Sequence, residues 1–117
     1  MFMFRWFRKP DPHRHWPRDN ALSAWFAFAQ QNAPRGLNWI GYEATAEATV
    51  QPPWAVVPVQ LQGEPTPDGP LADVPASREP RPVVAVFHWN GKVWCVVRTV
   101  MNLSAADVLG KLLATPA

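Results

Sequence analysis

The chain has 117 residues, of which 48% are hydrophobic, and its formal net charge is +2. This length suits one domain that can bury a core without disulfides or metal. A single cysteine, Cys95, excludes an intrachain disulfide and a cysteine-based zinc site. No apolar run reaches the roughly 20 residues that a membrane-spanning helix needs. We therefore expect a cytoplasmic protein with no transmembrane segment, in which Cys95 is a small buried hydrophobe.

The positive charge is concentrated in residues 1–18, which hold five basic residues and one acidic residue, whereas the remaining 99 hold six basic and eight acidic. Aromatic residues are interleaved with these charges, and three prolines interrupt the segment. We predict that residues 1–18 form a basic and aromatic arm and that residues 19–117 form one domain. The arm residues expected to bind a partner are Arg5, Trp6, Phe7, Arg8 and Lys9.

Three interpretations of the arm remain open. Its aromatic rings can pack on the domain or on a partner subunit while the charges stay in solvent. Basic side chains with interleaved rings also suit single-stranded nucleic acid, where cations follow phosphates and rings stack on bases. The same mixture suits an anionic membrane surface, although so short a segment buries little apolar area. We expect packing or protein docking first, nucleic acid second and membrane third.

The first predicted helix spans approximately residues 19–32. Asp19 or Asn20 is expected to be its N-cap, and Pro34 and Gly36 follow its end. Apolar residues recur at intervals of three and four, which predicts a helix with one broad buried face. That face comprises Leu22, Trp25, Phe26 and Ala29, with Phe28 on its flank.

Two strands and a long loop are predicted next. Residues 40–50 alternate between small or apolar side chains and Glu or Thr, as in a strand with one solvent-exposed face. We expect the alanines of the inner face to let the first helix approach closely. Residues 54–61 form a second apolar run, in which Pro58 favours an edge position or a bulge. Residues 63–82 contain six prolines and four acidic residues and are predicted to be a loop.

Residues 82–100 predict a β-hairpin. Two β-branched runs flank Asn90-Gly91, the dipeptide that best accepts the positive φ angles of a type I′ turn. A two-residue loop sets the register, so that the facing pairs are Trp89–Lys92, His88–Val93 and Phe87–Trp94. Alternation along the strands then predicts an aliphatic face with Val84, Val86, His88, Val93, Cys95 and Val97. The opposite face is predicted to carry Phe87, Trp89, Trp94 and Arg98.

The second predicted helix lies in the segment of residues 102–113. Ser104 and Asp107 have the spacing of a shortened capping box, so Ser104 is expected to be the N-cap. Leu103 and Val108 have the spacing of a hydrophobic staple. The buried stripe is expected to comprise Leu109, Leu112 and Leu113. The predicted fold is a single α+β domain with a four-stranded, mostly antiparallel sheet and an N-terminal and a C-terminal helix, in the order α-β-β-loop-β-β-α.

No catalytic site, metal site or cofactor is predicted. His13 and His15 could bind a divalent cation, but Arg14 between them opposes it. In the predicted register His88 and Cys95 are not opposite each other, so a nucleophile–base hydrogen bond is not expected. The sequence also lacks a phosphate-binding glycine loop, a C-x-x-C pair and the serine-hydrolase and zinc-protease motifs. An enzyme is therefore not expected.

The aromatic hairpin face is a second candidate contact surface. Its rings and cations have the chemistry of a sheet that stacks bases, provided that the face is open; if a helix covers it, the rings belong to the core. Both arrangements remain open. The hairpin residues expected in contact with a partner are Trp89, Lys92, Trp94 and Arg98.

These surfaces predict a non-catalytic interaction module or small subunit. We expect it to dock to a protein partner, or to a second copy of itself, through the arm and the sheet face. Single-stranded nucleic-acid binding is the alternative function, and a small ligand-binding protein or enzyme comes third.

Overall fold

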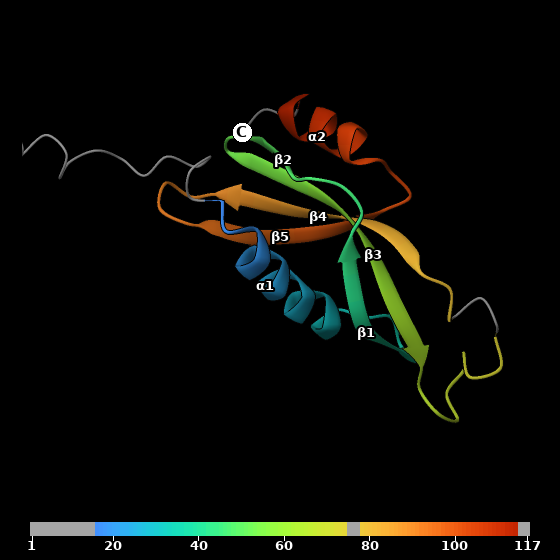
Figure 1. The fold of residues 1–117 in the computed structure, drawn as a ribbon. Helices are drawn as coiled ribbons and strands as arrows, with labels where there is room; N and C mark the ends of the chain where they lie inside the picture. Colours follow the sequence, from blue (N-terminus) through green and yellow to red (C-terminus); the bar gives the residue numbers. More distant parts are fainter. Residues whose placement is uncertain (1–15, 75–77, 115–117) are drawn as a thin grey trace, which may run out of the picture.

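The computed structural model describes residues 16–74 and 78–114 and has the predicted α+β architecture. A mostly antiparallel sheet is flanked by two helices (Figure 1). In chain order the elements are α1 (Arg18–Gln31), β1 (Leu37–Ala44), β2 (Thr49–Gln51), β3 (Trp54–Pro65), β4 (Arg81–Trp89), β5 (Trp94–Met101) and α2 (Ala105–Ala114).

The main strand order is β1-β3-β4-β5, and β2 pairs with the first part of β3. The single strand predicted over residues 40–50 is therefore two short strands, which pair with different parts of β3. As predicted, Tyr42 faces α1, with its ring 6.0 Å from the Trp25 ring and 4.8 Å from the Phe26 ring, and the core under α1 also includes Ala44, Ala48 and Val50. Ala46, predicted on the same face, is exposed. The sheet has five strands instead of four because the chain leaves β3 and returns to it between β1 and β2.

Pro58 was expected at an edge or a bulge, yet β3 is a central strand and its pairing with β4 is regular at Pro58. The Pro58 carbonyl accepts a hydrogen bond of 2.9 Å from the backbone N–H of Thr45, in the segment between β1 and β2. Because the N–H and C=O of one residue in an antiparallel strand point toward the same neighbour, the donor that proline lacks also faces this segment. Pro58 thus lies where the neighbouring strand is interrupted, which is why a central strand tolerates it.

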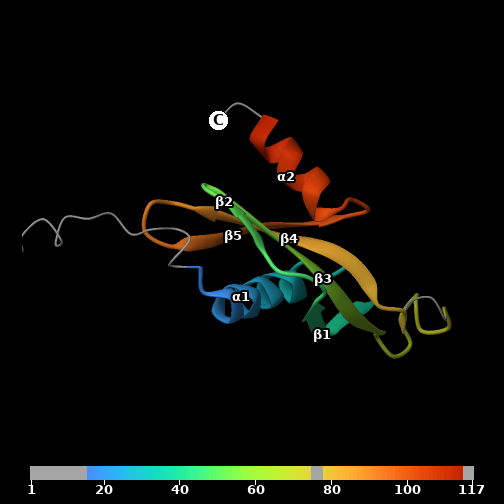
Figure 2. The same ribbon diagram turned by 45° about the horizontal axis from the view of Figure 1, so that its top comes forward.

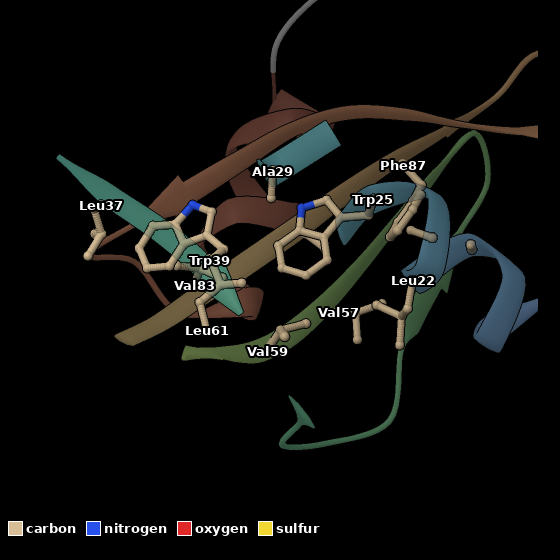
Figure 3. Close-up of a cluster of buried hydrophobic side chains, with 13 residues drawn as sticks. Leu22, Trp25, Ala29, Leu37, Trp39, Val57, Val59, Leu61, Val83 and Phe87 are labelled. Carbon is tan, nitrogen blue, oxygen red and sulfur yellow. The ribbon is translucent and has the colours of Figure 1, made fainter. Parts of the chain in front are cut away.

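One helix covers each face of the sheet, as Figures 1 and 2 show from two directions. The face under α1, called the α1 face, holds the larger core. There the fully buried Trp25 packs against β3 and β4 (Figure 3), and its indole Nε1 donates a 2.8 Å hydrogen bond to the Thr99 hydroxyl. The face under α2, called the α2 face, holds a smaller cluster built from Val56, Val84, Val86, Val108 and Leu109.

The N-cap prediction for α1 was wrong. The helix begins at Arg18, after Pro17, and no side chain caps it, so Asp19 and Asn20 lie in its first turn. The negative charge of Asp19 is favourable there, next to the positive end of the helix dipole, even though its side chain does not cap the helix. The Ser104 cap of α2 is confirmed, since its hydroxyl accepts a 3.1 Å hydrogen bond from the Asp107 N–H.

The predicted hairpin forms with a longer loop. Trp89 faces Trp94, which leaves four residues in the loop, and the side-chain oxygen Oδ1 of Asn90 accepts hydrogen bonds of 2.9 Å from the backbone N–H groups of Lys92 and Val93. The predicted register was therefore wrong by two residues. A shift of two leaves every side chain on its predicted face, because strand side chains alternate with a period of two.

A second irregularity does change faces. Phe87 faces Val96, but the residue before it on β4, Val86, faces Arg98. Val97 is therefore the extra residue of a β-bulge. Beyond the bulge the alternation of β5 is inverted. Arg98 lies opposite Val86 on the α2 face, instead of beside the aromatic residues on the α1 face where the sequence pattern put it.

Gly36 joins α1 to β1 and provides a stability test. Its φ is +85°, and an added Cβ would lie 2.9 Å from Cγ of Pro70. We expect Gly36→Ala to lower the free energy of unfolding by about 2 kcal/mol or more, since left-handed strain and overpacking act together. Urea unfolding measures this. Gly41→Ala, whose Cβ would meet nothing closer than 4.0 Å, is the control and should cause no loss; equal losses would contradict the explanation.

Candidate ligand-binding site

The arm residues predicted to bind a partner, Arg5 to Lys9, lie outside the described residues, as do His13 and His15. The hairpin residues are described. Trp89 and Trp94 are half-buried on the α1 face, Lys92 is exposed in the hairpin loop, and Arg98 is exposed on the α2 face. The structure therefore separates Arg98 from the two tryptophans.

The aromatic side of the hairpin is not an open platform. α1 packs on this face and Phe87 is fully buried in the core. The Trp16 ring lies against it at the hairpin end, 5.1 Å from the Phe87 ring and 5.2 Å from the Trp94 ring, both edge to face. The condition for base stacking, an uncovered face, is thus not met, and these rings are part of the core.

The α2 face contains a cavity of about 460 Å³ between the sheet and α2. Strand pairing explains its floor. On this face the side chains form rows across three strands, namely Trp54–His88–Cys95, then Val56–Val86–Arg98, then Pro58–Val84–Val100. The cavity lies over residues of all three rows.

α2 covers these rows incompletely. Val108 and Leu109, near its start, are buried, whereas Leu112 is half-buried and Leu113 is 50% exposed, so the prediction of a buried Leu113 was wrong. Figure 2 shows the corresponding inclination of the helix to the sheet. Because only the first turns of α2 pack closely, space remains under its second half, and Lys111 and Leu112 line that space.

The cavity wall is apolar and its rim is basic. Val86, Val100, Val108 and Leu112 contribute aliphatic surface, and Trp54 contributes an indole that meets the His88 ring at 4.8 Å between centroids. The polar side chains that line it are His88, Arg98 and Lys111, from β4, β5 and α2. Among the described residues that line the cavity, none is acidic.

His88 and Cys95 are directly opposite each other, contrary to the predicted register. Cys95 is exposed and not a buried hydrophobe, because it lies on the edge strand β5 beyond the cover of α2. Its Sγ accepts a hydrogen bond of 3.5 Å from the side-chain amide of Asn90. No hydrogen bond joins His88 to Cys95 in the described part of the chain, so this pair alone assigns no reaction.

Sequence reasoning missed the cavity because its basic rim depends on the bulge at Val97. A bulge of this kind requires no glycine, and Val-Val-Arg-Thr-Val reads as an uninterrupted strand. The other contributors, Trp54 and Lys111, lie 57 positions apart in the chain. The sequence assigns Trp54 to a strand and Lys111 to a helix, but it does not show that the two residues line the same cavity.

Within residues 16–74 and 78–114, no group of three or more His, Cys, Asp or Glu side chains is arranged to hold a metal ion. None of the helices in the same ranges is long and apolar enough to cross a membrane. Comparison of the chain with protein-family models, curated proteins and solved structures finds no match.

Proposed function

We propose that this protein is a non-catalytic binding module that holds a small, mostly apolar molecule in the cavity between α2 and the sheet. The observation that carries the proposal is the cavity itself, of about 460 Å³, walled by aliphatic side chains and one indole. Ligand sites usually occupy about 300–1,000 Å³ and combine an apolar lining with a few polar groups. The ligand-binding function that ranked third on sequence grounds therefore ranks first.

The other expected functions keep their status as predictions. Docking to a macromolecular partner through Arg5 to Lys9 depends on residues outside the described ranges. Single-stranded nucleic-acid binding loses the support of the hairpin face, because α1 covers it, and rests on the arm alone. Cytoplasmic localisation and the absence of an enzymatic activity are expectations of the same kind.

The neutral fluorophore N-phenylnaphthylamine tests the proposal, because its emission rises when it enters an apolar site. We expect the full chain to bind it saturably at one site, and Leu112→Trp, which fills the cavity, to weaken binding at least about tenfold. Leu113→Trp is the matched control, since the neighbouring Leu113 is 50% exposed and does not line the cavity; it should bind as the unchanged protein does.

Two results would overturn the proposal. One is the absence of saturable fluorophore binding by the unchanged, folded chain. The other is an equal effect of the Leu112 and Leu113 substitutions, which would locate the fluorophore elsewhere. Far-UV circular dichroism and thermal unfolding of both variants verify that the fold is retained, so that lost binding reports on the cavity.

A further inference from the structure

We infer that the ligand is a monoanionic amphipath, an apolar chain or ring that ends in a carboxylate held by Arg98; this inference rests on the proposed function. The argument begins with charge. Three basic side chains from three different elements line one apolar cavity, and among the described residues no acidic side chain lines it with them. An apolar wall with a basic rim of this kind complements a molecule with an apolar body and an anionic end.

The strand register explains why Arg98 is at this position. The bulge at Val97 inverts the alternation of β5, so Arg98 joins the row of Val56 and Val86 at the floor of the α2 face. Bulges occur next to binding sites, where they redirect a side chain. In a strand without the bulge, the side chain of Arg98 would lie on the α1 face, beside Trp94 and Val96.

Arg98 suits a carboxylate better than the other two groups do. Its planar guanidinium presents parallel donors that match the two carboxylate oxygens. Lys111 has a further interaction of its own and adds positive potential to the rim, and His88 is held by its ring contact with Trp54. Because it lies on the edge strand, Arg98 also borders a smaller hollow of about 300 Å³ on the α1 side, which Ala29 and Thr99 also line. Within the described residues, His88 and Lys111 do not line that hollow, so the three basic groups meet at the cavity under α2.

A matched pair of competitors tests the inference. Decanoate and decanol share the same alkyl chain and differ in the charged end group. Each is titrated against N-phenylnaphthylamine bound to the full chain, at low ionic strength because salt screens an exposed pair. We expect decanoate to displace the fluorophore at a concentration at least about tenfold lower than decanol does, a difference of one decade in affinity.

Arg98→Gln should remove most of this preference by weakening decanoate far more than it weakens decanol. Decanol thus verifies within the same sample that the variant is folded and the cavity intact. Arg78→Gln is the control for the loss of one positive charge, because Arg78 lies in the loop before β4 and does not line the cavity. It should retain the preference for decanoate.

The outcomes separate the two proposals. If decanol competes as well as decanoate, or if Arg98→Gln weakens both equally, the anionic ligand is wrong while the cavity remains a binding site. If Arg78→Gln abolishes the preference as strongly as Arg98→Gln does, general charge and not the Arg98 guanidinium is responsible, and the inference fails. If the unchanged chain binds no fluorophore, the proposed function fails first.

Discussion

Trp25→Ala is expected to lower the free energy of unfolding by about 3–5 kcal/mol, the usual cost of removing a large aromatic side chain from a core. Trp25 is fully buried between α1 and the sheet, and it meets both the Tyr42 ring and the Thr99 hydroxyl. A domain of this size has a total stability of about 5–15 kcal/mol, so the variant should lose a large part of it. Urea unfolding followed by far-UV circular dichroism measures the loss.

Thr99→Val separates the two contributions of Trp25. The substitution keeps the volume at position 99 but removes the acceptor of the indole N–H, which is then buried without a partner, at a cost of about 1–3 kcal/mol.

Trp54→Ala is the control for the loss of a tryptophan side chain in the Trp25→Ala variant. Because Trp54 is half-buried at the cavity, its loss should cost less than that of Trp25. Equal costs for both tryptophans would contradict the assignment of the main core to the α1 face.

Val108→Asp should undock α2 and abolish ligand binding. Val108 is 4% exposed and packs on the valine cluster of β3 and β4, where a carboxylate has no partner. A buried charge without compensation costs about 3–5 kcal/mol, and release of the helix limits this cost. We expect a reduced helical circular dichroism signal and no fluorescence from N-phenylnaphthylamine, while the Trp25 core still unfolds cooperatively.

Leu113→Asp provides the matched control for this prediction. It introduces the same charge on the same helix, but Leu113 is 50% exposed and outside the valine cluster. Only a small loss is expected, about 0.3–1 kcal/mol, from a negative charge near the C-terminal end of the helix dipole. Fluorophore binding that survives Val108→Asp would show that the cavity does not depend on α2.

The residues whose positions are predicted correctly lie in helices and strands whose regular spacing of apolar residues is not interrupted by a bulge or a break. The stripe of Trp25 and Ala29 identifies the buried face of α1, and the spacing of Ser104 and Asp107 identifies the start of α2. The faces of β4 also follow from alternation, since Phe87 lies on the α1 face and Val86 on the α2 face. Helix and strand periods are properties of the backbone, so a short stretch of sequence is enough to reveal them.

The candidate site depends on relations of another kind. Pro58 is compatible with a central strand only because β1 and β2 leave a gap beside it, and Arg98 reaches the cavity only because one residue of β5 is bulged against β4. Which helix covers which face is likewise a matter of packing, and it buries the aromatic side while it leaves a cavity on the aliphatic side. Pairing between strands that are distant in sequence determines which side chains are neighbours. A one-residue bulge moves the following side chains to the opposite face of the sheet, and the local sequence pattern does not reveal it. Most helices and strands of this protein can therefore be derived from its sequence, whereas its site emerges only when those elements pair and pack.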